Sequence, residues 1–170
     1  AVEIDPENVL AWAALGEHYN RRGATKAYLN ATYKLFTLRS VPISEKISMF
    51  RQLTANRRFY RDNYPQIDII ATTLHNNYPK DKGVTDLFAN HLISSGKIDE
   101  ALALYKAQTL DAEADLDSFL AVMEIESYLG QTDSVTLYLN RALKRYPNDA
   151  TLYLRRGHIH QMAKELDSAQ

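Results

Sequence analysis

The chain has 170 residues, of which 45% are hydrophobic and 24% charged, and its formal net charge is −1. So many apolar residues exclude a disordered chain, and the near balance of charge gives no general attraction to nucleic acid or anionic lipid. The absence of cysteine excludes disulfides, thiolate catalysis and cysteine metal sites. No stretch approaches the roughly 18 consecutive apolar residues of a membrane span, so none is predicted.

The first part of the chain carries apolar residues at three- and four-residue steps, which predicts helices that bury one face. A first helix, with Trp12 on its apolar face, is expected to end at Gly23, because glycine tolerates positive φ. A second helix is expected over Lys26–Thr37. Pro42 then begins the next segment, and Ser44 is placed to cap the helix of that segment.

Proline and glycine also punctuate the rest of the chain. The polar and aromatic stretch Asn56–Tyr64 indicates a connection, and Pro65 suits the first turn of a helix that ends near Tyr78, before Pro79. No segment competes as a strand. Later apolar rows predict helices over Val84–Ser95, Ile98–Tyr105, Phe119–Leu129, Val135–Leu143 and Leu152–Ile159, with ends at Gly96 and Gly130.

The punctuation recurs at a fixed interval. Pro79 and Pro147 lie 147 − 79 = 68 positions apart, and Gly96 and Gly130 lie 130 − 96 = 34 positions apart. The first helix contains the pattern Trp12-x₂-Leu15-Gly16-x₂-Tyr19. This pattern resembles the signature of the tetratricopeptide repeat (TPR) family, whose repeats are about 34 residues long.

The resemblance implies an all-α fold, a right-handed α-solenoid of antiparallel helix pairs in which successive pairs stack to form one core. Small residues at Gly16, Ala89 and Gly157 are expected to let helices approach closely. The implied units are the tail of a preceding repeat over 1–6, repeats over 7–41, 80–113 and 114–147, a divergent repeat over 42–79 and a truncated repeat over 148–170.

The repeats are not uniform. Pro6 and Pro79 lie 73 positions apart, five more than two periods, and the surplus falls between about Leu38 and Tyr78. Thr32 stands where the first full repeat should carry an aromatic residue. Residues 1–6 resemble the end of one repeat and residues 166–170 the beginning of a further helix, so we interpret the chain as a fragment of a longer array.

TPR proteins usually bind ligands on a concave face lined by the first helix of each pair, and the resemblance implies a groove for a peptide or a partner protein. One TPR subclass grips a terminal carboxylate with Lys and Asn at the positions of Ala13 and Glu17, and Glu17 would repel that ligand. The sequence therefore argues against this subclass. By position in the repeat, the groove residues are Ala13, Glu17, Asn20, Arg21, Asp86, Asn90, Asp117, Leu120, Glu124, Tyr128, Arg155 and His158.

Other candidate sites have simpler explanations. Arginines beside aromatic residues can bind nucleic acid, but pairing with neighbours such as Asp62 is the stronger interpretation. His158 and His160 are two residues apart and face different directions on a helix, so they predict no zinc site, and His160 is expected to pack in the place of a signature tyrosine. The arginines that lie beside aromatic residues are Arg51, Arg57, Arg58 and Arg61.

Polar residues with catalytic potential also lack a recognisable context. Glu17, Glu124 and Glu126 are expected on exposed helix positions, and tyrosines such as Tyr78 and Tyr146 are expected to pack with the hydroxyl at the surface. We therefore predict a protein-binding scaffold that is not an enzyme and uses no cofactor or metal. The alternatives are a module for self-association and a helical accessory region of a larger enzyme.

Overall fold

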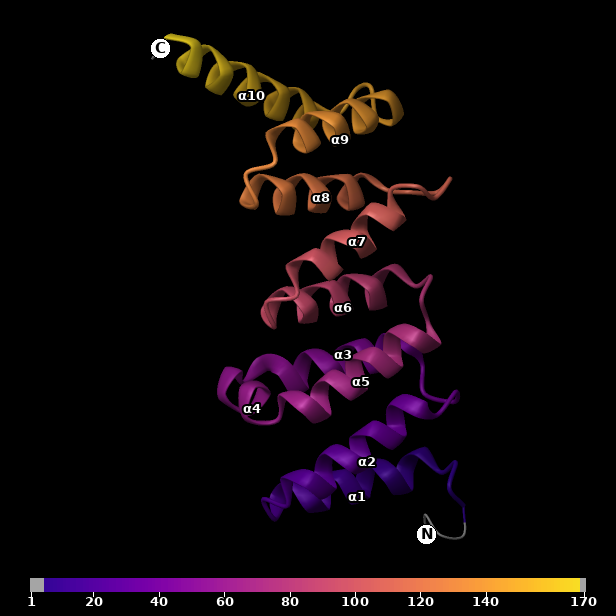
Figure 1. Ribbon diagram of the computed structural model, residues 1–170. Coiled ribbons are helices and arrows are strands. Elements are labelled where there is room, and N and C mark those ends of the chain that lie inside the picture. The colour runs from indigo at the N-terminus through magenta and orange to yellow at the C-terminus, as the bar shows by residue number, and fades with distance from the viewer. Residues whose placement is uncertain (1–4, 169–170) are drawn as a thin grey trace. The chain divides into compact units, whose positions relative to one another are not determined.

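A computed structural model describes residues 5–168 of the chain and the side chains of residues 5–161. These residues form ten helices and no strand (Figure 1), which confirms the all-α prediction. The chain divides into two compact units, Ala1–His91 and Leu92–Gln170. The helices are α1 (Val9–Arg21), α2 (Thr25–Thr37), α3 (Ile43–Ala55), α4 (Arg57–Asp62), α5 (Tyr64–Asn77), α6 (Lys82–Ser94), α7 (Ile98–Gln108), α8 (Leu116–Tyr128), α9 (Thr132–Arg145) and α10 (Ala150–Ser168).

Three helices end where the sequence places a glycine. Gly23, Gly96 and Gly130 each lie two residues beyond the last residue of α1, α6 and α8, and their φ angles are 67°, 81° and 73°. A residue with a Cβ atom is strained in this left-handed region, so glycine lets the chain turn there at low cost. The helix ends predicted at these positions are confirmed.

The helix starts agree with the sequence less uniformly. The Asn8 side chain accepts a hydrogen bond from the Ala11 N–H at 2.9 Å and caps α1, and Pro65 lies in the first turn of α5 as predicted. Ser44, predicted as the cap of α3, lies inside the helix, and Pro42 occupies the cap position. Because the proline ring fixes φ, the chain enters the helix at Ile43, before the serine is reached.

The segment predicted as a connection between two longer helices contains the short helix α4. The Asn56 side chain accepts a hydrogen bond from the Phe59 N–H at 3.0 Å and begins it. The starts of α1 and α3 are 43 − 9 = 34 residues apart, whereas those of α2 and α5 are 64 − 25 = 39 apart. The interval from α5 to α7 is again 98 − 64 = 34. The five surplus residues therefore lie between the starts of α3 and α5, where α4 is inserted.

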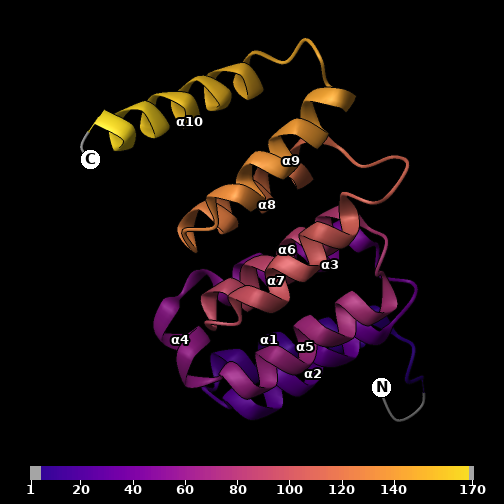
Figure 2. The ribbon, with the colours of Figure 1, turned by 45° about the horizontal axis from the view of Figure 1, so that its top comes forward.

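The core of the first unit centres on α2, which lies against α1 and α5 (Figure 2). Phe36 of α2 is fully buried, and Phe50 of α3 meets it edge-on with 6.4 Å between ring centroids. Ile67 and Leu74 of α5 complete this cluster without exposed surface. Apolar burial stabilises by about 25 cal/mol per Å², so this cluster holds α2, α3 and α5 together. A smaller cluster comprises Leu35, Leu38 and Val41, with Val9, Trp12 and Met49 packed against it.

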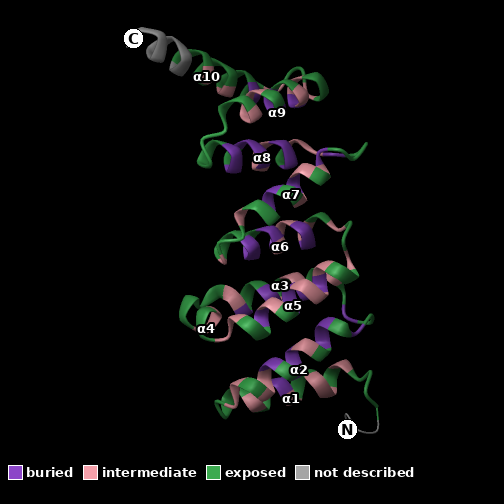
Figure 3. Ribbon diagram, viewed as in Figure 1, coloured by how far each residue is buried: buried purple, intermediate pink, exposed green. Residues whose placement is uncertain are grey.

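In the second unit, α8 packs against both α7 and α9, and α9 contacts α10. Val122 and Met123 of α8 are fully buried, as is Leu152 of α10. Figure 3 shows buried and exposed residues alternating along α8, as expected for a helix covered by two neighbours. Phe119, Val122 and Met123 of the predicted apolar row are thus buried, whereas Leu129 of the same row is 37% exposed.

The small residues predicted at close helix contacts differ in their surroundings. A methyl group at Gly16 would lie 3.7 Å from the Cβ of Ala31, which is an ordinary van der Waals contact between α1 and α2. Ala89 of α6 is fully buried. Among the described atoms, none lies within 4 Å of the position a methyl group would take at Gly157, so the close approach predicted there is wrong.

The C-terminal helix also departs from expectation. Helix α10 runs without a break to Ser168, so residues 166–168 do not begin a separate helix, and no glycine or proline after Gly157 is present to end the first one. His160, predicted to be packed, is exposed. Residues 1–4 and 169–170, where the sequence suggested a preceding repeat and a cut helix, lie outside the described residues.

Candidate functional site

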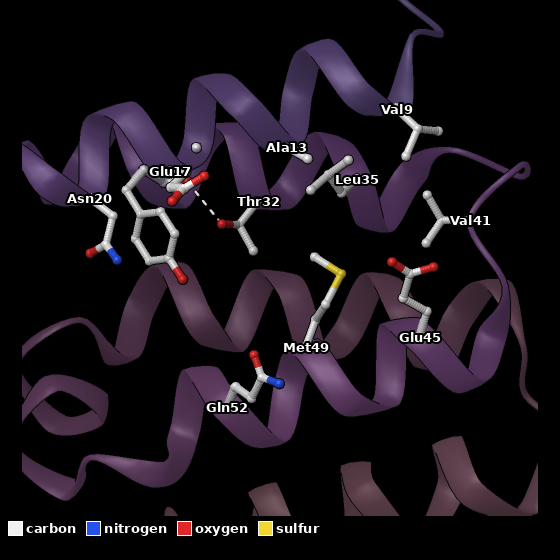
Figure 4. A pocket seen from close by; sticks show the side chains of 12 residues that line it. Val9, Ala13, Glu17, Asn20, Thr32, Leu35, Val41, Glu45, Met49 and Gln52 are labelled. Atoms are coloured by element: carbon white, nitrogen blue, oxygen red, sulfur yellow. Dashed lines mark hydrogen bonds between the residues drawn. The ribbon is translucent and has the colours of Figure 1, made fainter.

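A pocket of about 330 Å³ opens in the first unit between α1, α2 and α3 (Figure 4). Its volume is at the lower end of the roughly 300–1,000 Å³ typical of ligand pockets. The twelve residues that line it are Val9, Ala13, Gly16, Glu17, Asn20, Tyr28, Thr32, Leu35, Val41, Glu45, Met49 and Gln52.

Each of the three helices contributes one row of side chains to the pocket. The rows 13/17/20 on α1, 28/32/35 on α2 and 45/49/52 on α3 share the i, i+4, i+7 spacing of a single helix face. Gly16, Thr32, Leu35 and Val41 are buried and form the floor. The rim is formed by exposed residues, namely Ala13, Glu17, Asn20, Glu45 and Gln52. The pocket thus combines a largely apolar floor with a polar rim.

The two ends of the pocket both carry a carboxylate. Figure 4 places Glu17 and Asn20 at one end and Glu45 beside Val41 at the other, with Met49 between them. Glu17 forms an ion pair with Arg21, four residues further along α1. Both partners are largely exposed, at 62% and 75% of their side-chain surface, so water competes with this pair and it is weak.

Three of the predicted groove residues, Ala13, Glu17 and Asn20, line this pocket together. Arg21 lies beside them and pairs with Glu17 without lining the pocket. On α6, the Asn90 side chain donates a hydrogen bond to the backbone oxygen of Asp86 at 2.8 Å. Neither residue lines the pocket, so within the first unit the structure gathers the α1 residues of the prediction and leaves out those of α6.

Two of the predicted residues of the second unit pair with each other, and others are exposed to solvent. Glu124 of α8 and Arg155 of α10 are joined by an ion pair at 3.0 Å, and Tyr128 is 77% exposed. Asp117 and His158 are exposed and Leu120 is half-buried. An open hollow of about 390 Å³ in this unit involves none of them and is lined by Phe119, Arg141, Lys144 and Arg145.

The residues that sequence reasoning missed come from α2 and α3. The resemblance directed attention to the first helix of each pair, so the α2 row was assigned to the core alone. On α3 no residue matches the signature that fixes the register of α1. The row Glu45, Met49, Gln52 follows the i, i+4, i+7 spacing of a helix face beside the apolar row that contains Phe50 and Leu53.

The chain matches no protein-family model, and no curated protein matches it. The function must therefore be inferred from the residues and the pocket. Within the described residues, no helix is both long and apolar enough to span a membrane. Among the side chains that the structure describes, no three His, Cys, Asp or Glu residues gather as a metal site would require.

A polar network around the buried side chain of His91 lies elsewhere in the first unit. The hydroxyl of Tyr60 lies 2.8 Å from Nδ1 of His91, and Nε2 of His91 lies 2.9 Å from Oδ1 of Asp68. The network has a third hydrogen bond, which the Tyr64 hydroxyl donates to Oδ1 of Asp68 at 3.0 Å. One tautomer satisfies the whole network, with Tyr60 donating to Nδ1 and the Nε2–H donating to Asp68.

The surroundings of His91 favour a structural role. The pKa of Tyr60 is raised to about 12, first because burial disfavours the phenolate and then because the charges of Tyr64 and Asp68 oppose it. Tyr60 therefore keeps the proton that it donates. The imidazole has no exposed surface, and Tyr64 stacks on it with 5.4 Å between ring centroids. Although such a chain of groups can transfer protons, no substrate can reach this ring as it is packed.

The second unit contains a buried carboxylate that the sequence placed at the surface. Glu126 of α8 is only 3% exposed, so the prediction of an exposed position is wrong. Its Oε1 accepts a hydrogen bond from Ser134 at 2.6 Å and lies 2.5 Å from Nζ of Lys106. Burial alone would raise the pKa of this carboxyl, but the hydrogen bonds from Lys106 and Ser134, with the charge of Lys106, outweigh burial and lower the pKa.

Replacing Glu126 with glutamine is expected to lower the free energy of unfolding at pH 7 by about 2 kcal/mol, because hydrogen bonds to a charged group are lost. A carboxyl whose pKa is lowered by folding stabilises above its unfolded pKa and loses that contribution as the pH falls through its folded pKa. The difference in the free energy of unfolding between Glu126→Gln and the parent chain should therefore decrease below about pH 4.5. Urea unfolding at pH 7 and pH 3 measures this difference.

The matched control for that prediction is Glu124→Gln, which changes a carboxylate on the same helix that is 67% exposed. Its effect on unfolding should stay below about 1 kcal/mol, because ion pairs at the surface contribute little. Equal losses for the two variants at pH 7 would contradict a special role for Glu126.

The aromatic and basic residues of the sequence analysis have partners inside the chain. Arg58 and Arg61 lie 3.5 Å and 3.6 Å from the carboxylate of Asp62, as the simpler interpretation predicted. The tyrosine hydroxyls, predicted at the surface, instead bond internally. Tyr78 accepts a hydrogen bond from Lys46 at 3.0 Å, and Tyr146 donates one to the Ala114 oxygen at 2.7 Å.

Proposed function

We propose that this chain is a TPR-like helical-repeat module that binds an extended peptide segment of a partner protein between α1, α2 and α3. The proposal includes helix pairs that run antiparallel and stack as a right-handed solenoid. The observation that carries the binding function is the pocket of about 330 Å³, with three rows of side chains around an apolar floor. Grooves between helices commonly hold peptide segments in this manner.

The intervals between helices support the repeat assignment. The starts of α6, α8 and α10 are spaced 116 − 82 = 34 and 150 − 116 = 34 residues apart. A constant interval between the starts of corresponding helices is what a repeated structural unit produces.

The dimensions of the pocket support an extended peptide. The α3 row from Glu45 to Gln52 spans seven residue steps, or about 10 Å at 1.5 Å per residue. On α1 the row continues one turn further to Val9, which also lines the pocket, and from Val9 to Asn20 it spans eleven residue steps, or about 16 Å. An extended chain advances about 3.3 Å per residue. The pocket therefore matches a segment of about three to five residues.

A blocking variant tests the proposal directly. Ala13 and Ala14 are adjacent and exposed on α1, but Ala13 alone lines the pocket. Peptides are selected from a random display library against the intact chain, and their affinities are measured by calorimetry. We expect Ala13→Trp to weaken binding at least tenfold, because an indole fills the space above the floor. Ala14→Trp should bind as the parent chain does.

Both variants place tryptophan at an exposed helix position, so their thermal midpoints should stay within a few degrees of the parent chain. Selection of no peptide, or equal affinity of all three proteins for every selected peptide, would remove the pocket as the binding site.

A further inference from the structure

We propose that the pocket between α1, α2 and α3 selects a peptide segment with two basic side chains on either side of an apolar one, at alternate positions. This inference rests on the proposed function and specifies the ligand that the pocket takes. In a five-residue window, the pattern is basic, any, apolar, any, basic.

The charges on the rim determine the sign of the charge that the ligand carries. Of the twelve lining residues, Glu17 and Glu45 are charged and both are acidic, whereas none is a lysine, arginine or histidine. Complementary charge steers a ligand towards a site and excludes ligands of the same sign. An acidic segment would bring its carboxylates next to two others, so the pocket disfavours it.

The floor determines the kind of cation. Leu35 and Val41 are buried, and Met49 projects between the two ends of the pocket (Figure 4). A lysine or arginine side chain can lay its aliphatic stem on such apolar surface while its charged tip stays at the rim. A central apolar side chain fills the space around Met49, whose flexible thioether adapts to irregular shapes.

The spacing of the pattern follows from the lengths of the rows. Side chains at alternate positions of an extended chain point to the same side and lie about 6.6 Å apart. Three such side chains span about 13 Å, which falls between the lengths of about 10 Å and 16 Å calculated for the α3 and α1 rows. The outer side chains then reach the two ends, where Figure 4 places Glu17 and Glu45.

The polar rim can also hold the peptide backbone. Asn20 and Gln52 are exposed on α1 and α3, and each amide side chain offers both a donor and an acceptor. A backbone in extended form presents both kinds of group at its edges. These backbone contacts do not depend on the sequence of the peptide, so selectivity comes from the carboxylates and from the floor.

Arg21 affects how strongly Glu17 can bind a cationic ligand. Its guanidinium already pairs with Glu17, so an incoming cation must displace or share it. Because the existing pair is exposed and weak, a ligand that gains further contacts in the pocket can displace it. Removing Arg21 should therefore strengthen binding of a basic ligand, which is the opposite of the effect of removing Glu17.

The test uses four capped pentapeptides as probes, followed by amide chemical shifts of the isotope-labelled chain. The first probe is Arg-Ser-Leu-Ser-Arg. The second, Glu-Ser-Leu-Ser-Glu, reverses its charge, and the third, Arg-Ser-Asp-Ser-Arg, removes the apolar centre. The fourth, Ser-Arg-Arg-Ser-Leu, keeps composition and net charge but loses the alternation. We expect the first probe to bind at least fivefold more tightly than each of the others.

Matched variants of the chain test the carboxylates. Glu17→Gln and Glu45→Gln should each weaken the first probe about two- to fivefold, and Arg21→Gln should strengthen it about twofold. The control is Glu100→Gln, since Glu100 occupies the third residue of α7 as Glu45 does of α3 and is exposed outside the pocket. It makes the same change in net charge and should leave the affinity unaltered.

The outcomes separate this inference from the function on which it rests. If Ala13→Trp abolishes binding of selected peptides but the four probes bind equally, the pocket binds peptides and the basic pattern is wrong. If the scrambled probe binds as well as the first, net charge and not alternation governs binding, and the pattern is again overturned. If no selected peptide responds to Ala13→Trp, the proposed function fails and this inference fails with it.

Discussion

Replacing His91 with leucine is expected to lower the free energy of unfolding by about 3 kcal/mol, a large share of the stability of a typical domain. Leucine fills part of the ring volume but leaves the half-buried Tyr60 hydroxyl without its acceptor. Asp68 also loses the Nε2–H hydrogen bond, although 30% of its side-chain surface remains accessible to water. Urea unfolding followed by circular dichroism measures the loss. His18→Leu, at an exposed position of α1, is the control and should cost less than about 0.5 kcal/mol.

A double-mutant cycle with Tyr60→Phe identifies the cause of that loss. In the parent chain, Tyr60→Phe should cost about 1–2 kcal/mol, because the 2.8 Å hydrogen bond to His91 is removed. In the His91→Leu background it should cost at least about 1 kcal/mol less, since the partner is already absent. Additive effects would show that the two side chains contribute independently and that the network has no energetic meaning.

The parts of the fold that the sequence predicted are those decided by local chemistry. Gly23 and Gly130 end helices because the turn at each requires positive φ, and this requirement depends on neither tertiary contacts nor partners. The apolar rows likewise identified the buried faces. Helix α4 was not predicted, because its six residues carry no helical repeat of apolar side chains and its packed aromatics could equally belong to a loop.

The candidate site was predicted on one helix and missed on two. Glu17 and Asn20 were found because the signature around Trp12 fixes the register of α1. Glu45 and Met49 depend on how α3 is rotated against α2, and that rotation is decided by contacts between residues far apart in sequence. Periodicity gives the faces of a helix but not the neighbour that each face meets.

Buried charged groups were the least predictable feature. Charged side chains such as those of Glu126 and Lys46 usually lie at the surface, yet these two residues are 3% and 0% exposed. Each is tolerated because specific partners satisfy it, and those partners come from other helices. A single sequence shows the presence of a Lys or Glu but not which groups form hydrogen bonds with it in the folded chain.

Lys46 links these buried groups to the candidate site. It follows Glu45 in the first turn of α3, so the two side chains point in different directions, one into the core and one to the pocket rim. Its Nζ donates to the Leu38 oxygen at 2.7 Å and to the Tyr78 hydroxyl at 3.0 Å. These residues end α2 and α5, so one ammonium group fixes the start of α3 relative to two other helices and thereby positions the rim.

Lys46→Ala is expected to lower the free energy of unfolding by about 3–4 kcal/mol, because it leaves a cavity in place of the aliphatic stem and two oxygens without a donor. Lys46→Met keeps most of the stem and should cost only about 1–2 kcal/mol. In that variant the lost hydrogen bonds are partly offset, since an ammonium group no longer has to be buried. Urea unfolding of both variants separates packing from charge.

The control for this comparison is Lys26→Ala, at an exposed position of α2, which should cost less than about 0.5 kcal/mol. If Lys46→Ala costs no more than this control, the side chain is not buried as the structure places it. If Lys46→Met is more stable than the parent chain, the desolvation of the ammonium exceeds its two hydrogen bonds. In that case Lys46 would hold α3 in position at a net cost to stability, as buried polar groups that specify an arrangement sometimes do.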